Sequence, residues 1–279
     1  MTASVLAAPR AARLTFAGVV RSEWIKLRTL RSSWWCAGVI VGLSVLFGVL
    51  VALAVPGGTR LPGTQQAALA VQVLTLGVNF TQLVAAVLGV LVISGEYGTG
   101  MIRSTFAAVP RRIPAVLAKL LVLVVAVLAV GLVSSALTTL ASAPLLAAHG
   151  IGLGSDAAFW MPVVGASVYL ALIAALAFAI GALLRNSAGG IATALGLLLV
   201  VPIVVRLAAG LTRATWLQNV EAILPSNAGA QLFTYAAPAG PDLGASTLVL
   251  NGWGGFGIML AWIAVFLVPA LVLVRRRDT

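Results

Sequence analysis

The sequence has little charge and almost none of the residues from which metal and nucleophile sites are usually built. Of its 279 residues only 8% are charged, and it holds one cysteine, Cys36, and one histidine, His149. A single cysteine excludes an intrachain disulfide, and a single histidine has no second histidine or cysteine with which to bind a metal. A soluble domain carries about 25% charged residues because its surface must be hydrated. The shortage of charge therefore indicates a protein whose solvent is lipid.

The few charges are strongly biased to positive sign. The formal net charge is +11, which in a soluble protein would indicate a nucleic-acid partner. Most of these charges flank long apolar runs, however, and at such positions lysine and arginine report membrane orientation. We therefore expect a lipid bilayer as the surroundings of the chain and no nucleic-acid partner.

Long apolar runs dominate the sequence, which is 61% hydrophobic. A membrane-spanning helix needs roughly 20 mostly apolar residues, and the runs do not alternate as the strands of a membrane barrel would. Six runs are long enough, at about 34–55, 71–94, 119–141, 158–184, 188–205 and 255–274. The sequence predicts an all-α polytopic membrane protein, with an N-terminal segment at 1–33 and a six-span transmembrane domain at 34–279.

The lysines and arginines are unevenly distributed between the two ends of the predicted spans. With six spans, fourteen of the 17 basic residues fall on one side and only Arg60, Arg206 and Arg213 on the other. The positive-inside bias then places both termini in the cytoplasm. We expect a multi-pass protein of the plasma membrane.

The segment before the first span is amphipathic. In LTFAGVVRSEWIKLRTLRSSWW, helical spacing places six apolar residues on one face: Phe16, Val20, Trp24, Leu27, Leu30 and Trp34. This pattern is typical of a helix in the headgroup layer, with Trp24 at the boundary and Lys26 and Arg28 among the basic groups near lipid phosphates. A basic flank that only fixes topology is the alternative. Glu23 falls within the apolar stripe and should pair, either with Lys26 or with another basic group.

The segment ISGEYGTGMIRSTFAAVPRR, residues 93–112, interrupts the apolar sequence after the second span. Glu96 closes that span, glycines follow it, and Met101–Val109 can then form about two helical turns before Pro110. We predict a short helix on the cytoplasmic surface; an irregular loop is the alternative. Its apolar face would hold Ile102, Phe106 and Val109, opposite Arg103. Glu96 would pair with Arg103 or with a basic residue of the N-terminal helix.

Polar residues recur within the second predicted span, where they are costly unless paired or hydrated. Gln72, Thr75, Asn79 and Gln82 are spaced by three, four and three residues, which places them on one helix face. We interpret this face as the lining of a path or a subunit interface. Hydrogen bonding between helices of a single bundle is the alternative.

The order of these features resembles the cytoplasmic loop of permease subunits in the type-2 ABC exporter family. The glutamate that closes the second span is Glu96, and the Gly-Thr that follows is Gly98-Thr99. After the amphipathic helix come Pro110, Arg111 and Arg112, and Lys119 opens the third span. The stretch SEWIKLRTLRSSWW resembles the interfacial helix of actinobacterial members. Gly100-Met101 departs from many members, which place a different and often charged sequence there.

The resemblance implies that the helix at Met101–Val109 is a coupling helix and that the loop 96–118 couples this chain to a separate ABC ATPase subunit. Ile102, Phe106 and Val109 would enter a groove of the ATPase, while Arg103, Arg111 and Arg112 would contact its rim or lipid phosphates. The family works as two permease subunits, identical or different, with two ATPase subunits in a bacterial membrane, here in the direction of export. ATP and Mg would bind the partner, because neither lysine of this chain follows the glycine of a P-loop. This chain is then expected to bind no cofactor and to catalyse no reaction.

Two other functions remain open. An ion-coupled secondary transporter usually needs carboxylates or discontinuous polar helices inside the bilayer. The six acids of this chain all fall at or outside the ends of the predicted spans. A non-transporting membrane component of an ATPase-linked complex is the other alternative.

Overall fold

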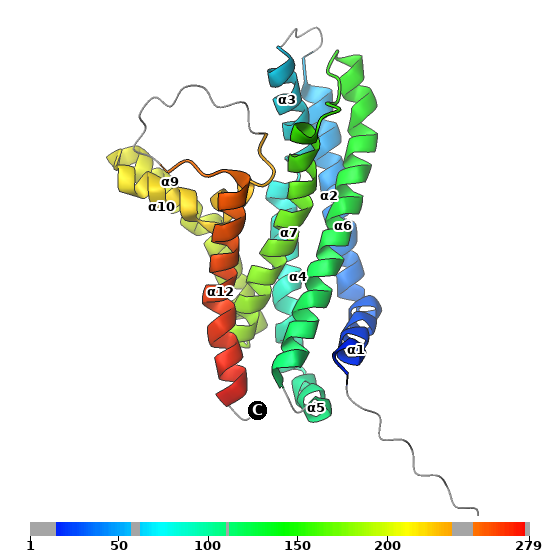
Figure 1. The fold of residues 1–279 in the computed structure, drawn as a ribbon, viewed down its shortest axis with the longest axis vertical. Coiled ribbons are helices and arrows are strands. Elements are labelled where there is room, and N and C mark those ends of the chain that lie inside the picture. Colours follow the sequence, from blue (N-terminus) through cyan, green and yellow to red (C-terminus); the bar gives the residue numbers. More distant parts are fainter. Residues whose placement is uncertain (1–14, 57–61, 110–111, 236–247, 277–279) are drawn as a thin grey trace, which may run out of the picture.

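The computed structural model describes residues 15–56, 62–109, 112–235 and 248–276. Within these ranges the chain is helical between short connections, and no strand occurs (Figure 1). Six of its helical segments are long and apolar enough to cross a membrane. The predicted class, an all-α membrane protein with six spans, is confirmed for the part of the chain that the structure describes.

The helices follow one another with short connections. Their bounds are α1 Phe16–Thr29, α2 Arg31–Ala54, α3 Gly63–Thr75, α4 Val78–Gly98, α5 Met101–Ala108, α6 Arg112–Ala148, α7 Ala157–Leu184, α8 Ser187–Leu195, a π-helical segment Gly196–Val200, α9 Val201–Thr212, α10 Thr215–Ile223, α11 Pro225–Ala230 and α12 Gly252–Arg276. The six spans are α2, α3 with α4, α6, α7, α8 through α9, and α12.

Most spans are longer than hydropathy alone predicted. Helix α6 runs from Arg112 to Ala148, well beyond 119–141, and the fifth span runs from Ser187 to Thr212 instead of ending at 205. The second span extends from Gly63 to Gly98 but is divided at Leu76 and Gly77, where α3 ends and α4 begins. Hydropathy marks the hydrocarbon-crossing part of a helix, whereas backbone hydrogen bonding continues beyond it.

Helix α7 is the centre of the bundle. Of its most apolar stretch 83% is buried, against 22% for α2 and α12 and 17% for α8 through α9. It packs against α4, α6 and α12 (Figure 1). The contact with α4 is as close as two backbones allow, because a methyl group added at Gly89 would lie 2.3 Å from the carbonyl oxygen of Ala174. The other spans therefore expose much of their apolar surface, as expected of helices in lipid.

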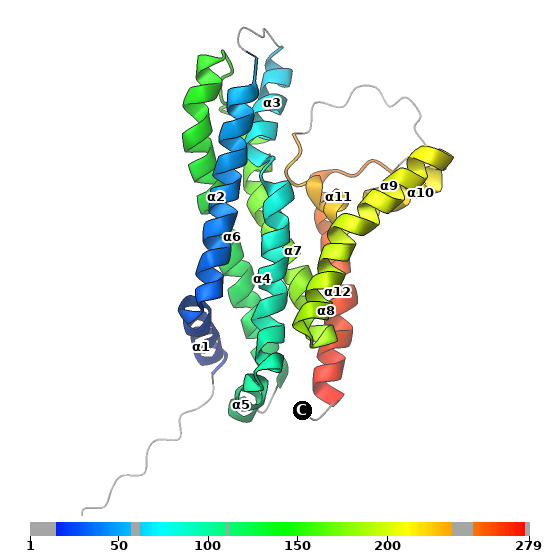
Figure 2. The same ribbon diagram turned by 180° about the vertical axis from the view of Figure 1, so that it is seen from behind.

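Helices α9 and α10 lie side by side and lean away from the rest of the bundle (Figures 1 and 2). An ion pair joins them, with 2.7 Å between Arg206 Nε and Glu221 Oε1. The connection between α9 and α12 thus contains two further short helices, α10 and α11.

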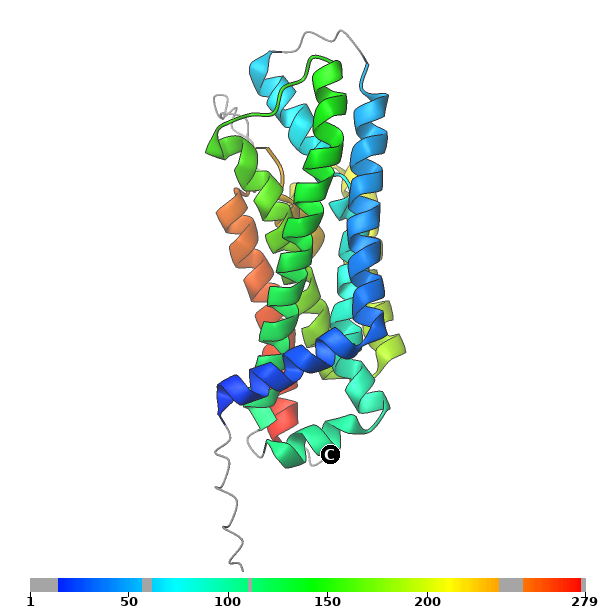
Figure 3. The same cartoon turned by 90° about the vertical axis from the view of Figure 1, so that its right-hand side faces the viewer.

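One end of the bundle carries the two surface helices, and we call it the α5 end. Helix α1 lies across this end, roughly perpendicular to the spans, and α5 lies beside it (Figure 3). The carboxyl end of α12 is at the same end. Both ends of the described chain are therefore on one side of the bundle; that this side is cytoplasmic stays a prediction.

Candidate functional site

Four charged side chains meet at the α5 end, and we call them the charge cluster: Glu23 and Lys26 on α1, Glu96 on α4 and Lys119 on α6. Local structure positions the two charges on α1. The side chain of Thr15 caps the amino end of α1 by accepting from the N–H of Gly18, and α1 ends at Thr29. The chain then turns sharply into α2.

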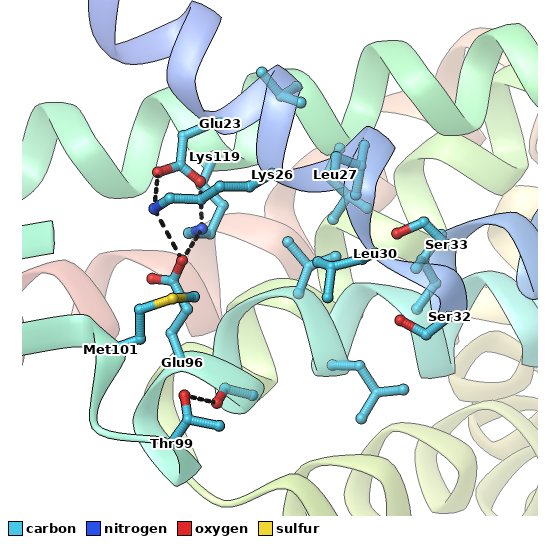
Figure 4. A pocket seen from close by; sticks show the side chains of 16 residues that line it. Glu23, Lys26, Leu27, Leu30, Ser32, Ser33, Glu96, Thr99, Met101 and Lys119 are labelled. Atoms are coloured by element: carbon cyan, nitrogen blue, oxygen red, sulfur yellow. Dashed lines mark hydrogen bonds and ion pairs between the residues drawn. The ribbon is translucent and has the colours of Figure 1, made fainter.

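The charge cluster is closed by reciprocal ion pairs (Figure 4). Lys26 Nζ lies 2.7 Å from Glu23 Oε1 and 3.1 Å from Glu96 Oε1. Lys119 Nζ lies 2.7 Å from Glu96 Oε1 and also donates to Glu23 Oε2. Each lysine thus bridges both carboxylates, and the two positive charges balance the two negative ones. The prediction that Glu23 pairs with Lys26 or with another basic group is confirmed, since it pairs with both Lys26 and Lys119, and of the two partners expected for Glu96 the structure selects a basic residue of α1.

Three of the four charges are withdrawn from solvent. Glu23, Glu96 and Lys119 are each 5% exposed or less, while the Lys26 side chain is 32% exposed. Burial lowers the pKa of Lys26, but hydrogen bonding to Glu23 and the nearby charges of Glu96 and Glu23 outweigh it, so the pKa lies above its ordinary value. Lys26 is therefore positively charged at neutral pH. A buried charge is tolerated only when it is paired in this way.

A cavity of about 350 Å³ adjoins the charge cluster between α1, α2, α4 and α6. Leucines and valines form much of its wall, and Lys119, Glu96 and Ser33 are among its polar groups. Glu96 Oε2 and Ser33 Oγ are buried and have no hydrogen-bond partner among the described residues. In Figure 4 the free oxygen of Glu96 lies on the Met101 side of the carboxylate, away from both lysines.

Helix α5 is connected to the charge cluster by one hydrogen bond. Gly100 adopts a left-handed backbone conformation, with φ 72°, which lets the chain reverse direction between α4 and α5. Lys26 Nζ then donates to Thr105 Oγ1 at 3.3 Å. A displacement of α5 would therefore act on α1 through Lys26, and through the charge cluster on the ends of α4 and α6.

The orientation of α5 differs from the sequence-based expectation. Ile102 is 4% exposed and belongs to the main core, and Val109 packs against the same core. Ile102 is therefore turned toward the bundle, and the expectation that it enters a groove of another protein is wrong; for Val109, which is only partly buried, it stays a prediction. The physical reason is that the apolar face of a short surface helix is covered first by its own bundle.

The outward face of α5 is formed by Met101, Arg103, Ser104 and Ala107, all of them exposed. The side chain of Phe106 and the whole of Arg111 lie outside the described residues. Arg112 begins α6, and its Nη1 donates to the carbonyl oxygen of Val274 on α12 at 3.4 Å.

The polar residues of the second span do not share one surface. Gln72 and Asn79 are exposed, whereas Thr75 and Gln82 are buried. Gln82 accepts from the hydroxyl of the buried Tyr169, and Thr75 donates to the carbonyl oxygen of Val71 in its own helix. The expected single polar face is wrong, because the stripe lies across the edge of the buried side of the helix: Gln72 and Asn79, seven residues apart, are exposed, and Thr75 and Gln82, also seven apart, are buried.

The buried stripe of α1 also differs from the predicted one. Val19, Glu23 and Leu27 face the bundle, while Phe16 and Trp24 are 50% and 38% exposed. Arg28 is exposed, and its carbonyl oxygen accepts from Trp34 Nε1 at 2.9 Å, which fastens the turn between α1 and α2. Trp34 belongs to α2, so the predicted apolar face continued past the end of α1.

Two functional groups were missed by reasoning from the sequence. Lys119 was placed at the start of a span, but α6 begins at Arg112, so this lysine lies two turns inside the helix; a lone lysine within an apolar run is the signal. The other is Arg185, which follows α7 and contacts Tyr97 of α4, with 5.2 Å between the guanidinium carbon and the ring centroid. Arg185 and Tyr97 are far apart in the sequence, so no local pattern indicates that they meet.

The described residues contain no group of three histidine, cysteine, aspartate or glutamate side chains that could hold a metal ion. The charge cluster has no reactive nucleophile, and its geometry joins helices α1, α4 and α6 mechanically. In comparisons with known proteins, no protein-family model and no curated protein matches the chain. Fold and site define a helical membrane protein with six candidate spans and a paired charge cluster beneath two surface helices.

Proposed function

We propose that this chain is the membrane-spanning permease subunit of an ATP-driven transporter of the ABC type, an exporter that works with a separate ATPase subunit and a second permease subunit. The observation that carries the proposal is α5, an eight-residue helix displayed at the end of the bundle and linked by Thr105 and Lys26 to the charge cluster. The resemblance of residues 96–119 to the loop of type-2 ABC exporters supports the same reading. ATP and Mg would bind the partner.

In this proposal the ATPase docks on the outward face of α5, at Met101, Arg103, Ser104 and Ala107. Movement of the ATPase upon ATP binding would press on α5. Because Thr105 contacts Lys26, and Lys26 bridges Glu23 and Glu96, the displacement would reach α1 and α4 together. The charge cluster would then transmit force between the docking surface and the spans.

Isolation of the chain from its own membranes tests the proposal. We expect an ATPase with a P-loop to be purified together with the tagged protein, and the complex to hydrolyse ATP. Ala107→Trp, a bulky side chain on the outward face of α5, should reduce the recovered ATPase roughly tenfold, the effect of about 1.4 kcal/mol. Arg213→Trp, at an exposed position outside α5, is the matched control and should leave recovery unchanged.

Two results would contradict the proposal. Recovery of the protein without any ATPase, together with substrate accumulation driven by a proton or sodium gradient alone, would identify an ion-coupled secondary transporter. An ATPase that is recovered equally with wild type and Ala107→Trp would place its docking surface elsewhere.

A further inference from the structure

A second charged site lies at the α5 end, and the buried donors of one of its arginines have no hydrogen-bond partner in the described chain. It is a pocket of about 470 Å³ whose walls are formed by the turn between α4 and α5 and by the turn after α7. The lining residues are Tyr97, Gly98, Thr99, Gly100, Ile102, Arg103 and Arg185. We call it the arginine pocket. Two arginines, and no carboxylate, are among its lining residues.

Arg185 presents a vacant hydrogen-bonding fork. Its Nε and Nη2 atoms are both buried, and neither has a hydrogen-bond partner in the described chain. These atoms point in parallel from one planar group, the arrangement that binds two oxygens of a phosphate or carboxylate at once. Leaving such donors buried and unpaired is costly, so an unoccupied fork indicates a ligand that the chain itself does not supply.

A ring contact and the backbone conformation both constrain the position of the Arg185 guanidinium group. The Tyr97 ring lies 5.2 Å from the Arg185 guanidinium carbon, which restrains the plane of that group. The backbone of Arg185 is left-handed, with φ 55°, so this position carries a conformation that glycine would adopt at lower cost. The Tyr97 hydroxyl is likewise buried without a partner. The amino end of α5 borders the pocket and adds the positive end of a helix dipole.

We propose that the arginine pocket binds the phosphate of an anionic phospholipid headgroup. The choice of a lipid follows from where the pocket lies: Tyr97 belongs to the last turn of one span, and Arg185 directly follows another. Span ends lie at the depth of lipid phosphates, and basic pockets between spans bind anionic headgroups. A choline headgroup would bring a cation toward Arg103 and Arg185, so the site selects against zwitterionic lipid. Of the fold, this inference uses only the six spans and the arginine pocket, and it does not depend on the proposed ATPase.

Native mass spectrometry of the purified full chain tests the inference, with phosphatidylglycerol and phosphatidylcholine as the probes. We expect wild type to retain phosphatidylglycerol in preference to phosphatidylcholine. Arg185→Gly removes the fork at a backbone conformation that glycine favours, so the variant should fold, and it should bind phosphatidylglycerol roughly tenfold more weakly. Arg185→Lys keeps the charge without the fork and should lie between these two. Arg213→Gly, at an exposed arginine with the same left-handed backbone, should match wild type.

Three results would overturn the inference. Equally tight binding of phosphatidylglycerol by Arg185→Gly and by wild type would reject it. Displacement of the lipid by millimolar inorganic phosphate would show that the site takes a free anion. A normal lipid complement in Arg185→Gly, with loss of a co-purifying protein, would assign the fork to an acidic side chain of a protein partner.

Discussion

The charge cluster and the arginine pocket lie at the same end of the bundle and handle buried charge in opposite ways. In the cluster, two lysines and two glutamates bridge one another, and only Glu96 Oε2 is left without a partner in the described residues. In the pocket, Arg103 and Arg185 line the same cavity, and the buried donors of Arg185 have no hydrogen-bond partner in the described chain. The difference teaches that the first site completes itself and joins helices, whereas the second requires an anion from outside.

The largest expected effect is that of unbalancing the cluster. Lys119→Met leaves the buried Glu23 and Glu96 facing each other with only Lys26, whose side chain is 32% exposed, between them. Removal of one partner from a buried ion pair costs about 3–5 kcal/mol. We expect the free energy of unfolding, measured in mixed micelles by tryptophan fluorescence, to fall by that amount. A loss below about 1 kcal/mol would show that the cluster is hydrated and contributes as little as a surface pair.

A balanced removal should cost less than the sum of the two single removals. Glu23→Leu with Lys119→Leu deletes one charge of each sign and leaves Lys26 paired with Glu96. Neighbouring residues in one network couple by about 0.5–3 kcal/mol, so the double variant should be more stable than the sum of the two single variants predicts. A double-mutant cycle measures this coupling. Strict additivity would mean that Glu23 and Lys119 do not interact.

A substitution in the arginine pocket should change stability much less. Arg185→Gly relieves a left-handed backbone and breaks no hydrogen bond of the buried donors within the described chain, but it removes the contact of the guanidinium with the Tyr97 ring. In detergent free of anionic lipid, we expect the free energy of unfolding to change by no more than about 1 kcal/mol, because the relief of the backbone and the loss of the cation–π contact offset each other. Thermal unfolding of wild type and variant side by side measures it. A loss comparable with that of Lys119→Met would show that Arg185 is held by an interaction inside the protein.

The smallest expected effect is that of pH on the contribution of Lys26 to the free energy of unfolding. The pKa of Lys26 is raised in the folded protein, so its contribution to stability is fully present below its unfolded pKa, about 10.4, and is lost as pH rises through the folded value. Between pH 7 and 9 wild type and Lys26→Met should therefore differ by a constant amount, which narrows above about pH 10.5. Unfolding measured across this range checks it. A difference that changes between pH 7 and 9 would contradict the assigned direction.

Much of the fold was predictable because hydropathy and periodicity are local properties. The six spans and the helices α1 and α5 follow from apolar runs, glycines and Pro110. The i,i+3 pair of Glu23 and Lys26 was likewise predictable, since both residues are on one helix. What failed depends on tertiary structure. Amphipathicity shows that α5 has a face to bury, but it does not say that its own bundle covers Ile102.

The polar stripe failed for a related reason. Its spacing places the four residues near one another on a helix, but it does not say which of them the bundle covers, and the structure buries only Thr75 and Gln82. The positions of Lys119 and Arg185 in their sites depend in the same way on residues that are distant in the chain.

Site-directed cross-linking tests the central claim, that α5 is the surface on which an ATPase docks. Because Cys36 is the single cysteine, a Cys36→Ser background allows one new cysteine at a time. We expect Met101→Cys, on the outward face of α5, to form an adduct with the co-purifying ATPase. Val249→Cys should form none. Val249 is 83% exposed and lies just before the amino end of α12, whose carboxyl end is at the α5 end. An adduct at Val249 with none at Met101 would contradict the claim.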